Sequence, residues 1–175
     1  VAAFSIVCYF FPIIFMVYNA IAQSAQPIIS YNFGAGQHAR VIKTLKLTII
    51  YATCVTTFGF IVGMLFSDWV VSIFTSDAEL IALSAKGLRI VVMFFPIIGF
   101  QMVTANFFQS IGMASKAIFL SLTRQMMVLL PCLIILPRFF GVAGVWYSMP
   151  ISDLLASLIA GTMLVWQLRK FKAQA

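Results

Sequence analysis

The chain of 175 residues is 63% hydrophobic and only 9% charged, whereas soluble globular domains are typically about 25% charged. This composition excludes a soluble domain and predicts an integral membrane protein. The formal net charge of +7 does not indicate nucleic-acid binding, because the basic residues stand in short clusters at the ends of apolar runs. We therefore expect the lipid bilayer as a partner and no nucleic acid.

Five apolar runs are long enough to cross a bilayer as helices, which takes about 20 residues each. They lie at residues 2–29, 45–66, 87–112, 117–136 and 142–166. The expected fold class is all-α, a polytopic bundle of membrane helices that occupies the whole chain, residues 1–175. The first run has no basic segment before it and is too long for a signal peptide, and the chain starts at a valine. These features predict a fragment of a longer protein.

Polar side chains recur along one face of the first run. Asn19, Gln23, Gln26 and Ser30 follow one another at helical spacings of four, three and four residues. An unsatisfied amide in hydrocarbon costs several kcal/mol or so. We therefore expect this face to contact other helices or to line a water-filled cavity.

The polar end of the first run closes with an abrupt turn. Pro27 lies near the exit of the run, and Gly34 and Gly36 follow in the sequence Asn-Phe-Gly-Ala-Gly. Glycine tolerates the positive φ that a sharp reversal requires. We interpret these three residues as a hinge turn on the cytoplasmic side.

Glycine and proline inside the runs carry further information. Gly59 and Gly63 form a GxxxG motif, and Ser157 and Gly161 form a related pair of small residues; both predict close helix packing. Four of the five runs also contain proline, at Pro12, Pro96, Pro131 and Pro150. These prolines either kink a static bundle or provide bending points for alternating access.

The third run contributes three amides among methionine and phenylalanine residues: Gln101, Asn106 and Gln109. A cavity lined by amides, aromatic rings and methionines would suit bulky apolar or cationic molecules. Alternatively, these amides hydrogen-bond to neighbouring helices, at roughly 1 kcal/mol each. The sequence leaves both interpretations open.

Two ionisable residues fall inside the predicted spans, where charge is costly and usually functional. Arg124 lies in the fourth run and Asp153 near the middle of the fifth. The rise of a helix places them about 10 Å apart in depth, so we predict a pair, direct or through water. Asp153 would then be an ion-coupling site, or the two residues form a buried brace; a third interpretation has Arg124 reaching the cytoplasmic surface alone.

The remaining charged residues set the orientation. One side carries Arg40, Lys43, Lys46, Lys116, Arg169, Lys170 and Lys172, and the other carries Lys86, Arg89 and Arg138 with Asp68, Asp77 and Glu79. Seven basic residues against three predict that the C-terminus is cytoplasmic and the N-terminus of the chain is outside.

Known catalytic motifs are absent from the sequence: there is no GxSxG, P-loop, GxGxxG or HExxH, and no Cys and His set with metal-ligand spacing. One histidine and four acidic residues leave little for acid–base chemistry. We expect a carrier rather than an enzyme, with no metal and no cofactor.

Several short segments together resemble one transporter family. They are residues 25–36 (AQPIISYNFGAG), 120–125 (LSLTRQ), 130–131 (LP), 144–146 (GVW) and 150–153 (PISD). Their order and spacing are similar to the second half of a multidrug and toxic compound extrusion (MATE) transporter, from its eighth helix to its twelfth.

The resemblance implies a twelve-helix antiporter of two six-helix lobes in the bacterial cytoplasmic membrane. Such proteins export drugs and small organic cations in exchange for H+ or Na+ by rocking of the lobes. The chain would supply five helices of the second lobe and would lack the N-terminal lobe as a partner. Some members carry an acid in the tenth helix, but residues 87–112 contain none, so Asp153 is the one acid left within the expected spans.

Two other functions stay open from the sequence. The first is a flippase for lipid-linked oligosaccharides from the same superfamily, although such carriers usually need a strongly cationic cavity. The second is a non-transporting membrane scaffold, which the polar face at Asn19 and Gln23 disfavours.

Overall fold

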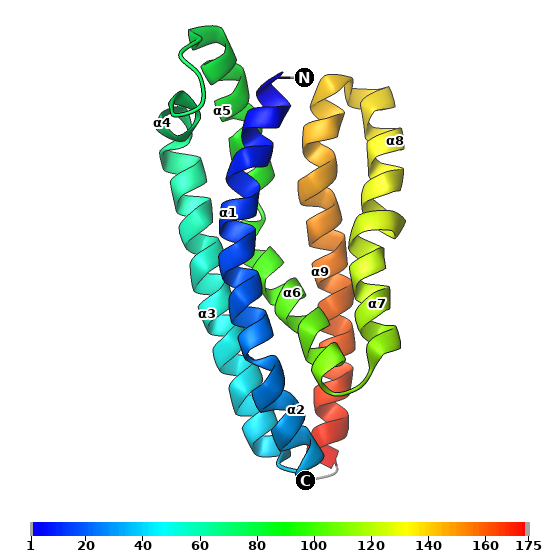
Figure 1. Cartoon of the computed structure of the whole chain (residues 1–175). Helices are drawn as coiled ribbons and strands as arrows, with labels where there is room; N and C mark the ends of the chain where they lie inside the picture. The colour runs from blue at the N-terminus through cyan, green and yellow to red at the C-terminus, as the bar shows by residue number, and fades with distance from the viewer. Residues whose placement is uncertain (1, 174–175) are drawn as a thin grey trace.

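A computed structural model describes the backbone of residues 2–173 and the side chains of residues 12–171 (Figure 1). That part of the chain is helical throughout and contains no strand. In chain order the elements are α1 (Ala2–Ser24), α2 (Gln26–Gly34), α3 (His38–Leu65), α4 (Ser67–Ser72), α5 (Ala78–Val92), α6 (Phe95–Ser110), α7 (Ala114–Leu122), the π-helical segment η1 (Thr123–Leu129), α8 (Leu130–Phe140) and α9 (Val142–Ala173).

Four of these stretches are long and apolar enough to cross a membrane: Pro12–Gly34, His38–Leu65, Ala114–Phe140 and Val142–Phe171. The pair α5 and α6 makes a fifth if the two helices are counted as one span. The predicted fold class, an all-α bundle of membrane helices, is confirmed. Hydropathy suffices for this because a bilayer requires each crossing segment to satisfy its own backbone hydrogen bonds as a helix.

The third expected span, residues 87–112, differs from the structure in two ways. The helix begins earlier, at Ala78, because the Asp77 carboxylate accepts hydrogen bonds from the backbone N–H groups of Glu79 and Leu80. The helix then ends at Val92 and resumes at Phe95 with a bend of 48°. Pro96 explains the break, since it has no N–H to donate to the carbonyl of Val92 one turn earlier.

The helices also extend past the expected spans at the end where basic residues gather. Helix α3 begins at His38 rather than at residue 45, and α9 continues to Ala173 rather than ending at 166. Arg40 and Arg169 therefore stand on helices and not in loops. Hydropathy misses these turns because their charged side chains lower the local average.

Glycine sets how closely the helices approach. A Cβ on Gly59 would lie 3.0 Å from Ile14 of α1, and one on Gly63 would lie 2.8 Å from Val92 of α5. The close packing predicted from this GxxxG motif is confirmed. Gly161 has only an ordinary contact, 3.8 Å from Phe100, so the second small-residue motif does not mark an equally close approach.

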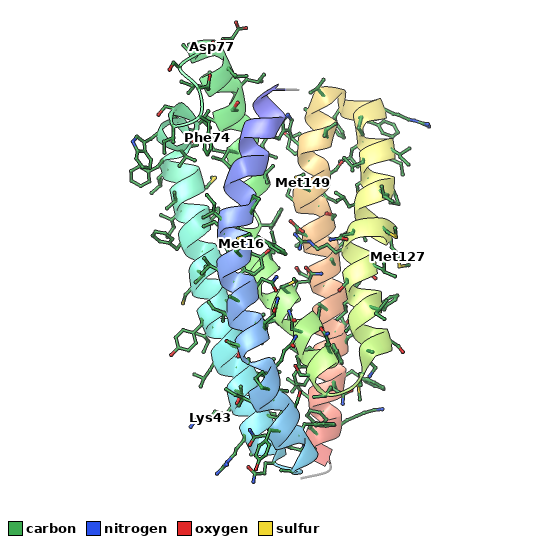
Figure 2. The ribbon with its side chains drawn as sticks, viewed as in Figure 1. Met16, Lys43, Phe74, Asp77, Met127 and Met149 are labelled. Atoms are coloured by element: carbon green, nitrogen blue, oxygen red, sulfur yellow. The ribbon has the colours of Figure 1, made fainter. Side chains whose placement is uncertain are left out.

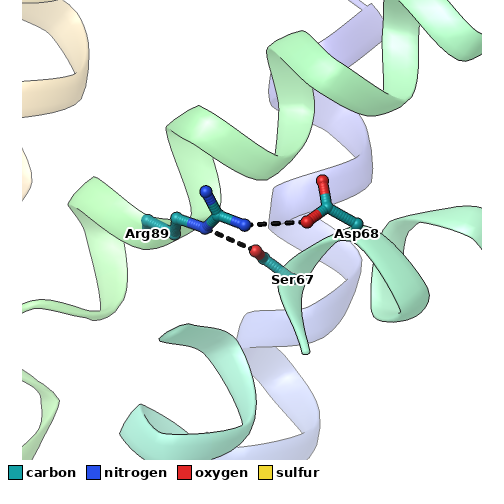
Figure 3. A network of polar contacts seen from close by, with 3 residues as sticks. All are labelled: Ser67, Asp68 and Arg89. Atoms are coloured by element: carbon teal, nitrogen blue, oxygen red, sulfur yellow. Dashed lines mark hydrogen bonds and ion pairs between the residues drawn. The ribbon is translucent and has the colours of Figure 1, made fainter. Parts of the chain in front are cut away.

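The two ends of the bundle differ in charge. The turns that join α2 to α3 and α6 to α7 lie at the same end as the C-terminus, whereas α4 and the start of α5 lie at the other end (Figure 1). Lys43 and Asp77 mark these opposite ends (Figure 2). At the Asp77 end, Arg89 joins α5 to α4: its Nη2 lies 2.7 Å from Asp68 Oδ2, and its Nε donates to Ser67 Oγ at 2.7 Å (Figure 3).

Candidate functional site

The polar face of α1 and α2 divides into two parts. Towards the turn it holds helices together, because Gln26 Nε2 donates to Asn106 Oδ1 of α6 at 2.7 Å and the Ser30 hydroxyl donates to the Ser110 carbonyl at 2.8 Å. Higher on α1, Gln23 Nε2 donates only to Asn19 Oδ1 of the same helix, at 3.1 Å. Asn19 is half-buried and Gln23 is exposed. This upper part of the face presents its amides away from the described helices.

The three amides of α6 do not share one surface. Gln101 is 2% exposed, and its Oε1 accepts no hydrogen bond within the described part of the chain. Asn106 is held between α2 and its own helix, where its Nδ2 donates to the Met102 carbonyl at 3.0 Å. Gln109 is exposed. Asn106 therefore behaves as an interhelical contact, and the cavity-lining role of all three amides stays a prediction.

The predicted hinge turn has one residue that requires glycine. Gly36 has a φ of +68°, a conformation that glycine adopts at little cost. Gly34 is the last residue of α2 and has no positive φ, and Pro27 lies in the first turn of α2. Positive φ thus explains Gly36 but not Gly34, and the hinge motion itself stays a prediction.

Arg124 and Asp153 are in direct contact between η1 and α9. The Arg124 Nε lies 2.7 Å from Asp153 Oδ1, and the side chains are only 16% and 6% exposed. Of the two geometries expected from the sequence, the structure has the direct one. Pairing offsets the cost of placing either charge in a poorly solvated site.

A local change in helix type carries Arg124. Pro131 cannot donate to the carbonyl of Met127, and the turns before it widen into η1, which includes both Arg124 and Met127. Such π-helical turns within α-helices often occur at functional sites. The widened turn, rather than a regular helix, positions the guanidinium opposite α9.

Tyr18 of α1 completes this site, and the sequence did not single it out. Its side chain is 2% exposed, and its hydroxyl lies beside Arg124 within electrostatic range of Asp153. The hydroxyl makes no hydrogen bond among the described residues. Tyr18 belongs to the buried face of α1 and α2 that continues with Ala22, Ala25 and Ile29. Its polar tip on that otherwise apolar face is the signal that could have revealed it.

The three side chains connect parts of the bundle that otherwise have little contact. Tyr18 comes from α1, Arg124 from η1 and Asp153 from α9. A carboxylate, a guanidinium and a neutral hydroxyl within mutual reach can bind or release a proton or a small cation at the carboxylate. In the described part of the chain, no group of three or more His, Cys, Asp or Glu side chains could hold a metal ion.

A model of the MatE family matches residues 1–135. The chain belongs to the MatE family. The resemblance to multidrug and toxic compound extrusion transporters found from the sequence is thereby confirmed. Members of this family are membrane transporters and not enzymes.

Individual MatE relatives agree with this assignment. The chain is 24% identical over 159 residues to the multidrug export protein MepA of Staphylococcus haemolyticus strain JCSC1435, which covers 88% of the chain and 33% of MepA. MepA of Staphylococcus aureus strain bovine RF122 / ET3-1 is 25% identical over 158 residues, covering 88% of the chain and 34% of that protein. The chain thus spans about a third of the length of these curated relatives.

Solved structures show the same fold. The MATE multidrug transporter DinF-BH in complex with rhodamine 6G superposes with a TM-score of 0.86 at 34% identity, over 93% of this chain and 36% of that chain. A MATE structure in the bent conformation gives a TM-score of 0.91 at 19% identity, over 99% of this chain and 39% of that chain. The latter likeness concerns the fold alone.

Proposed function

We propose that this MatE chain forms part of the second lobe of an antiporter that exports drugs or small organic cations in exchange for H+ or Na+. Residues 1–175 would supply five spans of that lobe, and an N-terminal lobe of the same protein would complete the cavity. Rocking of the two lobes in a bacterial cytoplasmic membrane would expose the cavity to each side in turn.

The observation that carries the proposal is the amide pair on the upper part of α1. Asn19 and Gln23 bond to each other and to no other helix, although α1 is otherwise strongly apolar. Amides turned towards lipid would lose hydrogen bonds at a cost of several kcal/mol or so. A hydrated cavity beside α1 avoids that cost and provides groups that bind polar parts of a substrate.

The nature of the substrate rests on the relatives. MepA proteins are multidrug export proteins, and DinF-BH, 34% identical to this chain, was solved in complex with rhodamine 6G. We therefore take rhodamine 6G as the probe for this protein.

Ion coupling would take place at the Arg124, Asp153 and Tyr18 site. Asp153 can exchange its Arg124 partner for a proton or a cation, and Tyr18 would transmit the change to α1, which carries the amide pair. A lipid-linked oligosaccharide substrate fits less well, because the pyrophosphate of such a substrate needs free positive charge and Arg124 is already paired with Asp153.

Cysteine accessibility in the intact protein tests the cavity. Cys8, Cys54 and Cys132 are first replaced by serine, and Asn19→Cys and Gln23→Cys are then treated with a water-soluble thiol reagent. We expect both to react, and rhodamine 6G to slow the reaction, because the amide pair would line the substrate pathway.

Phe58→Cys is the matched control for this experiment. Phe58 is 64% exposed on α3, within an apolar stripe that would face lipid, so its thiol should stay unreactive. If the thiols at 19 and 23 are as unreactive as the thiol at 58 in every state of the protein, the hydrated cavity and the proposed function that rests on it are wrong.

A further inference from the structure

Trp166, near the C-terminal end of α9, lies under two lysine side chains. Lys170 Nζ is 3.7 Å from the centre of the Trp166 ring, and Lys116 Nζ, from the first turn of α7, is 4.7 Å from it. Lys116 also donates to the Gln167 side-chain oxygen at 3.1 Å. The π-face of the indole thus gathers two cations from different helices.

Acidic side chains do not balance this charge. The whole sequence has four acids. Asp153 pairs with Arg124 and Asp68 with Arg89, while Asp77 and Glu79 stand at the start of α5, at the opposite end of the bundle (Figure 2). Among the side chains that the structure describes, no hydrogen bond or ion pair engages Lys170. An anion from outside the chain would relieve the repulsion between the two ammonium groups.

A groove opens beside the two lysines. It has a volume of about 300 Å³ and is lined by Lys116, Thr162, Met163 and Trp166. Exposed apolar side chains continue from it along α9 towards the middle of the bundle, with Leu158 60% and Leu155 43% exposed. The surface therefore combines a cationic end with an apolar track, which matches the two chemical parts of a phospholipid.

We propose that Lys116, Trp166 and Lys170 form a binding site for the headgroup of an anionic phospholipid of the cytoplasmic leaflet. The phosphate would bridge the two ammonium groups above the indole, and an acyl chain would lie along Met163, Leu158 and Leu155. Tryptophan and lysine are both favoured at the depth where headgroups meet hydrocarbon. Because α7 and α9 both contribute, the lipid would join the two helices at this end.

Native mass spectrometry of the intact protein tests the site, with dioleoyl phosphatidylglycerol compared against dioleoyl phosphatidylcholine. We expect wild-type protein to retain phosphatidylglycerol preferentially. Lys170→Gln should weaken phosphatidylglycerol binding about fivefold, the usual effect of one lysine at an anionic membrane surface. Lys170→Arg should restore it. Lys170 is the informative position because its removal leaves the contact between Lys116 and Gln167 intact.

Arg169→Gln is the matched control, since Arg169 is an exposed cation at the same depth of α9 but has a different facing on the helix. An equal loss from Arg169→Gln and Lys170→Gln would show general surface attraction and overturn the proposal. Absence of any preference for phosphatidylglycerol in the wild type would do the same. Glycerol phosphate, a headgroup without acyl chains, should not displace the bound lipid; displacement at equal concentration would assign the site to free phosphates instead.

Discussion

The contact between Arg124 and Asp153 shows how a single pair can combine stability with function. Both side chains are largely removed from solvent, so each charge depends on the other for compensation. Loss of one partner leaves an uncompensated charge, which typically costs about 3–5 kcal/mol, whereas the intact pair contributes much less. A pair with this energy balance is sensitive to any proton or cation that competes for the carboxylate.

Charge exchange separates a brace from a coupling site. Asp153→Asn and Arg124→Gln should each lower the free energy of unfolding by about 3 kcal/mol, as measured by thermal unfolding of the purified intact protein. The double variant Arg124→Asp with Asp153→Arg should recover most of this loss. Arg138→Gln, which removes an exposed cation from α8, is the control and should have little effect.

The two roles then give different transport results. A brace predicts that the stable charge-exchanged protein also exports rhodamine 6G, whereas a coupling site predicts that it is stable but does not respond to an ion gradient. Full stability of the Asp153→Asn single variant would contradict both roles.

At the level of whole helices, the prolines behave differently from one another. Pro96 follows the 48° break between α5 and α6, and Pro131 follows the π-helical segment η1. Pro12 and Pro150 lie inside helices that continue past them. Of the two interpretations left open by the sequence, a change of helix direction or type occurs only at Pro96 and Pro131. These two sites are the better candidates for bending during transport.

Helix packing provides a sharper test at Gly87 of α5. A Cβ on this residue would lie 2.5 Å from the ring of Trp146 on α9, and a buried indole cannot move aside easily. Gly87→Ala should therefore lower the free energy of unfolding by about 1–3 kcal/mol, detectable as an earlier thermal transition.

Gly161→Ala provides the comparison for Gly87→Ala. It places the same methyl group on α9 with its nearest neighbour 3.8 Å away, so the gain in helix propensity should make this variant neutral or slightly more stable. If both variants have the same thermal transition, close approach of α5 to α9 does not limit the stability of the bundle.

On the scale of the whole molecule, charge is segregated along the bundle axis. Arg40, Lys43, Lys116 and Lys170 lie at the end that carries the C-terminus, and Asp68, Asp77 and Glu79 lie at the other (Figures 1 and 2). Basic residues near membrane spans favour the cytoplasmic side. This arrangement supports the predicted orientation, with the C-terminus cytoplasmic.

Two exposed turn residues test that orientation in cells. Ser76→Cys precedes α5 and Gln37→Cys precedes α3, in a background without the native cysteines. A membrane-impermeant thiol reagent should label position 76 in intact cells and position 37 only after permeabilisation. The reverse pattern would show that the positive-inside rule fails for this chain.

The sequence by itself determined the membrane class, most of the spans and the two intramembrane charges, because a bilayer penalises polar groups so strongly that their positions are informative. It also predicted the turn at Gly36 and the close packing at Gly59 and Gly63, since both depend on the absence of a Cβ. These features follow from the local chain and its lipid surroundings.

Only the tertiary structure decided which side chains meet across helices. Gln26 and Asn106 are 80 residues apart, and nothing local pairs them. Tyr18 joins the charged pair, and Trp166 gathers two lysines. In an apolar run a tyrosine or tryptophan fits packing and recognition equally well, so its role is fixed only by the neighbours that folding brings to its polar edge or its π-face.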